Sequence, residues 1–340
     1  MRPTAMSFSR LSTICEAAPI PGSVNEDACS IWSDGEKITV LVVDGVKQRI
    51  TGTKLQQLIT AYDDCATGAS YVAHLTRSIT AIQALDDKPL PLQELLLQAN
   101  TALRSQLEYI YGELTANAWL KAEPQLSFFN EDPRLIRVAL PAGVATIARV
   151  DLVTRRLEFA HAGDTALFLF YQDGRIVQKT DDQMIKHDMQ VFELARTIQS
   201  EKGIPFSQAL KDERVKEMNL YNGIYHNYVD HNRQVDTKVG IGVIDGLPQL
   251  AAYIQQGTVD LNDVTSVLIC SDGLIWPAGW NESNDERIVR LQRMRKQIEQ
   301  LNLSGYLAEL RNAEQADTTC DLYPRFKKHD DATGIYLELF

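Results

Sequence analysis

Acidic residues stand directly beside four of the most apolar segments of this sequence. The pairs are Asp44-Gly45 after ITVLVV, Asp272-Gly273 after VTSVLICS, Asp330-Asp331 before ATGIYLEL, and Asn25-Glu26-Asp27 before ACSIW. A carboxylate beside a core strand is costly unless it is paired or binds a metal ion. If these strands are neighbours, five or six carboxylates converge, and cations are needed to stabilise them at neutral pH. Oxygen-only ligation suits Mg²⁺ or Mn²⁺ better than zinc.

An Asp-Gly pair is also an ordinary turn signal. Three such pairs are interpreted as turns only: Asp34-Gly35, Asp173-Gly174 and Asp245-Gly246. Asp44, Asp272 and Asp330 differ from them, because each stands beside a long apolar run that predicts a buried strand.

The elements that must position these aspartates follow from the hydrophobic pattern. Apolar and β-branched runs predict strands at 38–43, 143–150, 156–161, 166–171, 239–244, 264–270 and 334–339. Helical spacing of apolar residues predicts helices near 70–85, 92–111, 189–200 and 285–313. The strands cluster without regular βαβ alternation, which favours antiparallel sheets with helices packed outside them, an α+β layered domain.

The segment 183–236 has a different character from the rest of the chain. It is polar, carries mixed charge and contains no clear core strand. We interpret it as an insertion or flap over the surface of one domain that spans residues 1–340, and we expect it to shape substrate choice.

Composition excludes several classes of protein. The 340 residues include 34 Lys and Arg against 45 Asp and Glu, a net charge of 34 − 45 = −11, which argues against a broad nucleic-acid footprint. No apolar run approaches the length that spans a bilayer, and no segment resembles a signal peptide. The five cysteines form no CxxC pair, so we expect free thiols and a soluble, cytoplasmic protein without membrane partners.

Six motifs give the sequence a family resemblance. In chain order they are GSVNEDA, VVDGV, HAGDTALFLF, KTDDQ, VLICSDGLIW and DDATGIYLEL. This order resembles that of the type 2C protein phosphatases, which are metal-dependent Ser/Thr phosphatases. The resemblance implies a four-layer α-β-β-α sandwich, in which two antiparallel sheets are flanked by helices.

The resemblance also implies a metal centre made of carboxylates. Asp44 would bridge two Mn²⁺ or Mg²⁺ ions, and the carbonyl of Gly45 would ligate the second ion. Asp272 and Asp330 would ligate the first ion, with Asp331 in reserve for Asp330.

Three further residues have roles implied by the same motifs. Glu26 and Asp27 would act on metal-bound water or ligate directly, so that they and Asp44 form the catalytic set. Asp164 would pack behind the ligands. From its position directly before Asp330, and not from the motifs, His329 could donate a hydrogen bond to a ligating carboxylate. The implied reaction is hydrolysis of phosphoserine or phosphothreonine in phosphorylated proteins by a metal-activated water, with a role in signal transduction.

Two departures from the family pattern leave alternatives open. Gly22 stands where family members often have a phosphate-binding Arg, and Val46 stands where some have a His. Lys47, Arg49 or a flap residue could replace the Arg. The chain could therefore also be a catalytically weak or inactive binding or sensing module, or a phosphoesterase that acts on small molecules.

Overall fold

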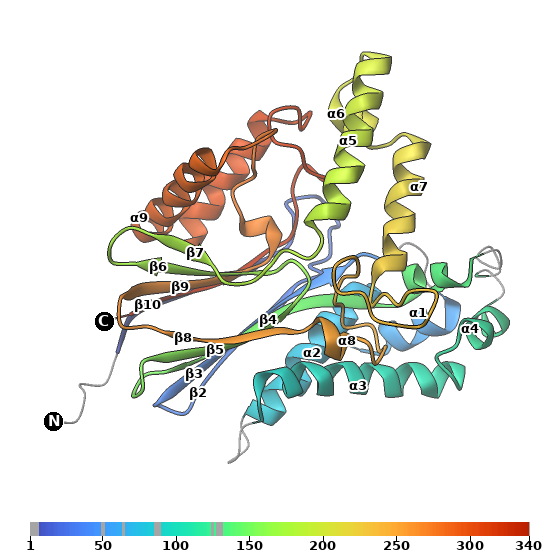
Figure 1. Cartoon of the computed structure of the whole chain (residues 1–340), viewed down its shortest axis with the longest axis horizontal. Helices are drawn as coiled ribbons and strands as arrows, with labels where there is room; N and C mark the ends of the chain where they lie inside the picture. The colour runs from blue at the N-terminus through green and yellow to red at the C-terminus, as the bar shows by residue number, and fades with distance from the viewer. Residues whose placement is uncertain are drawn as a thin grey trace.

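Two stacked sheets form the centre of the molecule. The computed structural model describes residues 7–48, 52–62, 65–84, 90–123, 126 and 132–339. Both sheets are five-stranded and antiparallel, and helices cover their outer faces (Figure 1). The predicted α+β class and the helix–sheet–sheet–helix layering are therefore confirmed.

Strands predicted from the sequence occupy the middle of each sheet. The first sheet has the order β1 (Phe8–Glu16), β10 (Ala332–Leu339), β9 (Val264–Cys270), β6 (Ala166–Tyr171) and β7 (Ile176–Gln178). The second has the order β2 (Ala28–Ser33), β3 (Lys37–Val46), β4 (Ala142–Asp151), β5 (Arg156–Ala162) and β8 (Gln255–Asp260). The pattern did not predict β1, β7 and β8, because edge strands carry more polar residues than strands covered on both sides.

Helices form the two outer layers. On the second sheet lie α1 (Thr53–Thr60), α2 (Gly68–Ala84), α3 (Leu92–Tyr111), α4 (Ala116–Ala122), η2 (Pro133–Ala139) and α8 (Leu250–Tyr253). The first sheet is covered by α9 (Asn284–Ala316), which is kinked at Asn302. Leu85, the expected end of the helix near 70–85, lies outside the described residues. Among the helices described, none combines the length and apolarity that crossing a membrane requires.

Strand β3 illustrates why the central strands are apolar throughout. Val40 and Val42 pack in the core between the two sheets, whereas Leu41 and Val43 pack in the cluster formed with α2 and α3. Successive side chains of a strand point to opposite faces, so a strand covered on both faces reads as a continuous apolar run. Packing on both faces holds the strand in place, and this also fixes the position of Asp44 near its end.

The segment 183–236 contains more helix than its sequence predicts. It forms α5 (Ile185–Lys202), α6 (Phe206–Ala209), α7 (Glu213–Asn222) and η3 (Gly223–Tyr225), which project away from the sheets (Figure 1). Val191, Ala195 and Phe206 share a small apolar cluster with Cys320 of the loop after α9. We refer to α5, α6, α7 and η3 as the insertion helices. That they are a flap within one domain of residues 1–340 stays a prediction.

The strand predicted at 239–244 is wrong. Ile241 and Ile244 make only isolated bridges, to His226 and Gly143. Their side chains are buried although the segment belongs to neither sheet. The apolar pattern of the segment therefore reflects burial and not a strand. Gly240 packs so closely against the Tyr253 side chain that a larger residue would collide with it.

Candidate active site

The predicted aspartates gather where the two sheets end. Asp44 lies in the last part of β3, Asp272 follows β9 as the first residue of η4 (Asp272–Leu274), and Asp330 precedes β10. Strands β9 and β10 are paired neighbours, and β10 also contacts β3 of the other sheet. The geometry therefore brings carboxylates from both sheets to one place.

Electrostatics shows how closely these groups interact. Removal from water raises the pKa of Asp44 well above its usual range, and the charges of Asp27, Asp272, Asp164 and Asp330 raise it further. Five predicted site residues thus act on one another. Their mutual repulsion favours either a bound proton or a bound cation.

Asp27 is the most enclosed member of the group. Its side chain is 3% exposed, and one oxygen accepts a 2.8 Å hydrogen bond from the Ser271 hydroxyl. Burial raises the pKa of Asp27, as do the charges of Asp331 and Asp272, while the Ser271 hydrogen bond acts in the opposite direction. Ser271 therefore fixes the orientation of a carboxylate that has little contact with water.

Asp272 and Asp330 face a cavity and share a cation. Desolvation and the charge of Asp330 raise the pKa of Asp272 to about 6, while the ammonium of Lys327 lowers it. One oxygen of Asp330 lies 2.6 Å from the Lys327 nitrogen and also accepts the Asp331 N–H at 2.9 Å. Lys327 thus supplies one positive charge to the acidic group.

Asp331 and Glu26 are linked through the backbone. The two oxygens of Asp331 accept the N–H groups of Ala18 and Glu26, both at 2.7 Å. This carboxylate therefore holds the loop that carries Glu26 and Asp27 against the start of β10. Asp331 is accordingly engaged with backbone amides, whereas Asp330 faces the cavity.

Two glycines beside the aspartates are required by close packing. A Cβ atom at Gly45 would collide with the backbone oxygen of Glu26, and one at Gly273 would collide with the backbone oxygen of Asp331. Neither glycine has a positive φ. Gly45 and Gly273 let the segments that carry the carboxylates approach one another.

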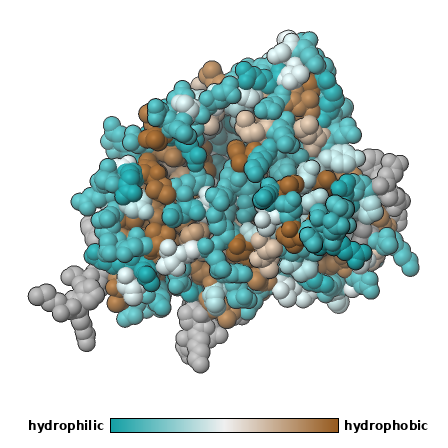
Figure 2. Space-filling model, viewed as in Figure 1, coloured by the Kyte–Doolittle hydropathy of each residue, from teal (hydrophilic) through white to brown (hydrophobic). Residues whose placement is uncertain are grey.

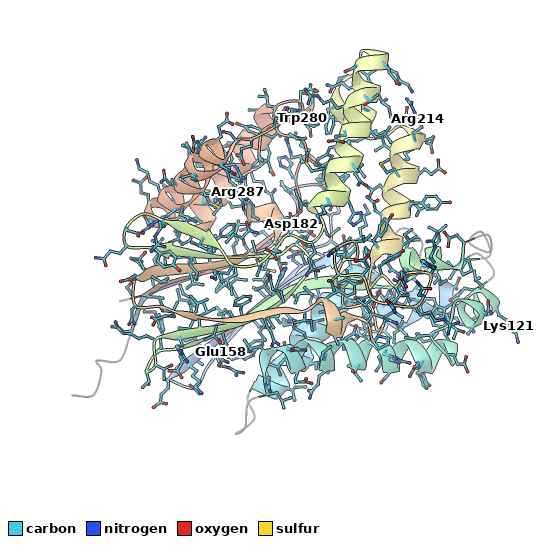
Figure 3. The ribbon with its side chains drawn as sticks, viewed as in Figure 1. Lys121, Glu158, Asp182, Arg214, Trp280 and Arg287 are labelled. Atoms are coloured by element: carbon cyan, nitrogen blue, oxygen red, sulfur yellow. The ribbon has the colours of Figure 1, made fainter. Side chains whose placement is uncertain are left out.

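The cavity is large and mixed in character. It has a volume of about 700 Å³ and lies between α9, the insertion helices and the loops after β9 and α9. Its carboxylates are Asp164, Asp181, Asp182, Asp188, Asp272, Glu282, Glu314 and Asp330, and its aromatic residues are Phe168, Trp276, Trp280, Phe192 and Phe326. Figure 3 shows Asp182, Trp280 and Arg287 around it, and Figure 2 shows the molecule hollowed on this face.

Asp164 lines this cavity. One of its oxygens is buried and accepts no hydrogen bond within the described part of the chain. Desolvation and the charges of Asp272, Asp182 and Asp188 raise its pKa. Asp164 therefore has a buried carboxylate oxygen without a donor among the described residues, and its charge interacts with that of Asp272.

Five of the cavity carboxylates had no role assigned from the sequence, and two of them, Asp182 and Asp188, act on the charges of the predicted site residues. Asp182 belongs to the motif KTDDQ, which was the available signal for it. Asp188 lies in the first turn of α5, and desolvation and the charges of Asp182 and Asp272 raise its pKa to about 7. No pattern in the sequence connects Asp188 with the site, because the insertion helices bring it there.

The expectation for His329 needs correction. Its Nδ1 lies 2.7 Å from Glu314 of α9, and Glu314 also pairs with Arg311 at 2.9 Å. Arg311 in turn donates to the backbone oxygen of Asp330. His329 therefore acts on the Asp330 loop through Glu314 and Arg311, not by a hydrogen bond to a ligating carboxylate.

The donor set fits a hard divalent cation in its chemistry. It consists of carboxylate and carbonyl oxygens with excess negative charge, and the charge of Asp164, which has one buried oxygen without a donor among the described residues, acts on it. Within the described residues, no three His, Cys, Asp or Glu side chains are already arranged as a metal-binding group.

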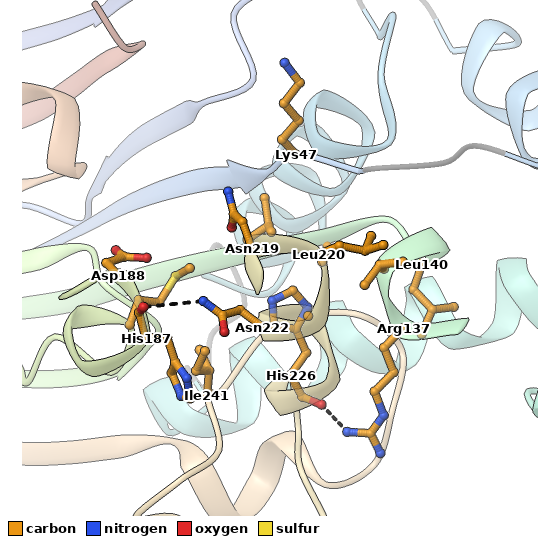
Figure 4. Close-up of a pocket in the computed structure, with 15 residues that line it drawn as sticks. Lys47, Arg137, Leu140, His187, Asp188, Asn219, Leu220, Asn222, His226 and Ile241 are labelled. Atoms are coloured by element: carbon orange, nitrogen blue, oxygen red, sulfur yellow. Dashed lines mark hydrogen bonds between the residues drawn. The ribbon is translucent and has the colours of Figure 1, made fainter. Parts of the chain in front are cut away.

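A second, smaller cavity adjoins the first. It has a volume of about 60 Å³ and shares Asp188 with the large cavity. Its lining is largely apolar and also includes Lys47, Arg137, His187 and Asn222. Asn222 donates to the His187 backbone oxygen at 3.4 Å, and the Lys47 side chain extends away from the other polar groups (Figure 4). Lys47 does not line the large cavity, and Arg49 lies outside the described residues.

Comparison with known proteins gives likeness in structure only. No protein-family model and no curated protein matches the chain. Serine/threonine phosphatase Stp1 from Staphylococcus aureus is similar with a TM-score of 0.49 and 11% identity, over 98% of this chain and 95% of that one. The catalytic domain of serine threonine protein phosphatase PstP with two manganese ions gives 0.44 and 14%, over 98% of both chains.

RsbX in complex with magnesium is also similar, with a TM-score of 0.42 and 11% identity over 98% of this chain and 100% of that chain. Likeness at such identities leaves activity open. The observed layers, two antiparallel sheets flanked by helices, agree with the fold that the resemblance to type 2C phosphatases implies.

Proposed function

We propose that this chain is a metal-dependent phosphatase that hydrolyses phosphoserine and phosphothreonine in proteins. The observation that carries the proposal is the convergence of Asp27, Asp44, Asp164, Asp272 and Asp330 beside one open cavity. Packing so many carboxylates together lowers stability unless a cation offsets their charge, so a functional reason is needed for the cluster.

The groups that would hold Mn²⁺ or Mg²⁺ are the carboxylates of Asp44, Asp272, Asp330 and Asp27 and the carbonyl of Gly45. Such ions, when bound, supply Lewis-acid chemistry and lower the pKa of water to near neutrality. The chain orients these groups: Ser271 fixes Asp27, and Asp331 fixes the loop that carries Glu26.

The cavity provides room for the phosphorylated segment of a protein. Its volume of about 700 Å³ is within the range of small-molecule and peptide side-chain sites. Trp280 and the exposed Phe326 offer apolar surface close to the acidic residues. This combination supports a phosphorylated peptide as substrate more than a small, fully polar phosphate ester.

The test is hydrolysis of a phosphothreonine peptide and of p-nitrophenyl phosphate, with Mn²⁺, with Mg²⁺ and with EDTA. Asp44→Asn and Asp272→Asn should reduce metal-dependent turnover on the order of 10³-fold. Asp173→Asn is the matched control, because Asp173 ends an exposed turn and pairs with Arg175. It should keep wild-type activity.

The other outcomes are distinct. Turnover of the small ester alone would favour the small-molecule phosphoesterase. Metal binding by folded protein without any turnover would overturn the proposal and favour the binding module, with Gly22 and Val46 as the first suspects.

A further inference from the structure

Lys327 brings a cation directly to the acidic group. It stands three residues before Asp330, and its ammonium pairs with an Asp330 oxygen at 2.6 Å. The charges of Asp330, Asp272 and Asp44 all act on this ammonium. The side chain lines the large cavity and is 41% exposed, so its flexible stem has room to move.

The other cations in the cavity wall are engaged elsewhere. Arg290 holds Glu282 through two hydrogen bonds of 2.6 and 2.8 Å. Arg325 donates to Asp317 at 2.8 Å and to four backbone oxygens. Arg287 donates to Gln178 of β7 at 2.9 Å. Of the described Lys and Arg side chains in this wall, Lys327 alone pairs with an aspartate of the cluster.

Gly22, at the position where a phosphate-binding Arg was expected, has no side chain that could bind phosphate. Gly22 lies in an exposed loop with φ +79°, and no atom lies within 4 Å of where its Cβ would be. A phosphoryl group carries two negative charges, and the acidic residues of the site repel it. A positively charged side chain is therefore needed to bind it there. Lys47 lines the small cavity instead.

We propose that the Lys327 ammonium binds the phosphoryl oxygens of the substrate, and that it rests on Asp330 when no substrate is present. This inference rests on the proposed function. A lysine acts as a mobile point charge for phosphate, whereas an arginine would grip it with a planar fork.

This arrangement has two consequences of opposite sign. The ammonium competes with a divalent cation for the Asp330 oxygen, so removing it should tighten metal binding. The same removal should weaken phosphate binding, because the phosphoryl oxygens lose a cation. A merely structural role for Lys327 would instead weaken both.

The experiment compares wild type, Lys327→Met and Lys327→Arg with Lys328→Met. Lys328 adjoins Lys327 in sequence but does not line the large cavity. Calorimetry would measure binding of Mn²⁺ alone, then of inorganic phosphate to the Mg²⁺-loaded protein. Steady-state rates on a phosphothreonine peptide would give KM and kcat separately.

In Lys327→Met, we expect the phosphate Kd and the KM to rise about 10- to 100-fold, the magnitude of one charge-assisted hydrogen bond. The Mn²⁺ Kd should fall severalfold, kcat should change less than KM, and Lys327→Arg should restore much of the phosphate binding. Lys328→Met should match wild type throughout.

Unchanged phosphate Kd and KM in Lys327→Met would overturn the inference, as would equal weakening of metal and phosphate binding. Both binding measurements proceed without turnover. Failure of the proposed function would appear instead as an inactive wild type that still binds metal, so the two failures are distinguishable.

Discussion

The five Asp-Gly pairs of this chain have the same two residues but fall into two groups, which differ in the backbone conformation and packing of the glycine. In three of them the glycine has a positive φ: Gly35 at +92°, Gly174 at +88° and Gly246 at +85°. In Asp44-Gly45 and Asp272-Gly273 the glycine has no positive φ and is required instead by close backbone packing.

The aspartates differ in the same way. Asp34, Asp173 and Asp245 each accept hydrogen bonds from backbone N–H groups of their own turn, at 2.7, 3.0 and 2.9 Å respectively. Asp44 and Asp272 are surrounded by other carboxylates, and their pKa values are raised. Asp34 and Asp173 are satisfied within exposed turns, whereas Asp245 is buried, which raises its pKa to about 6. What sets Asp44 and Asp272 apart is that the charges of neighbouring carboxylates raise their pKa values further.

The sharpest way to break this comparison is to add one methyl group to each kind of glycine. Gly273→Ala should push the Asp331 backbone and displace Asp272 from Asp330, which we expect to reduce turnover on the order of 10²-fold. Gly174→Ala should leave turnover intact and cost about 1–2 kcal/mol, because alanine is strained at positive φ.

Phosphopeptide hydrolysis and thermal unfolding of both variants would check this. Equal activities in the two variants would show that the close contact at Gly273 has no part in positioning the carboxylates.

A second test asks whether a buried turn aspartate behaves like a site aspartate. Asp245 is 1% exposed and accepts the Asn227 side-chain amide at 2.7 Å. Asp245→Ala should destabilise the protein by about 1–3 kcal/mol, because a buried donor loses its partner. Turnover per folded molecule should stay at the wild-type level, as measured by denaturant unfolding beside an activity assay. A large loss of turnover would place Asp245 with the site group.

The pH dependence of the metal-free protein separates the groups more finely. Burial and neighbouring charges raise the pKa of Asp272 to about 6 and that of Asp188 to about 7, above the value of about 3.8 for the unfolded chain. The folded state therefore binds more protons than the unfolded state in this range, and stability falls as pH rises from about 4 to about 7.

We expect the melting temperature in EDTA to fall by a few degrees across that range, and Mn²⁺ to remove most of the fall. The variant Asp188→Asn, Asp272→Asn should show a smaller fall, whereas Asp173→Asn should follow wild type. A steeper or unchanged fall in the double variant would contradict the pKa assignments.

The sequence predicted the positions of the candidate ligands to the extent that strands define them. Asp27, Asp44, Asp272 and Asp330 stand next to apolar runs, and a run covered on both faces fixes where its end lies. The central strands were predicted for the same reason. The edge strands β1, β7 and β8 were not, because their polar residues resemble those of loops.

The remaining site residues depend on long-range packing that no local pattern encodes. Asp188 reaches the cavity on the insertion helices, and Lys327 reaches it on an irregular loop. His329 pairs with Glu314, which lies fifteen residues earlier on α9, and not with a ligating carboxylate as expected. Spacing along the chain carries no information about such pairs.

The most direct test of the central claim is equilibrium binding of Mn²⁺ to wild type and to Asp44→Asn, with Asp173→Asn as control. The claim is that aspartates from the two sheets form one divalent-cation site. We predict saturable, EDTA-reversible binding in wild type and Asp173→Asn, and an affinity at least about tenfold lower in Asp44→Asn. Equal binding by all three proteins, or no binding by folded wild type, would contradict the claim.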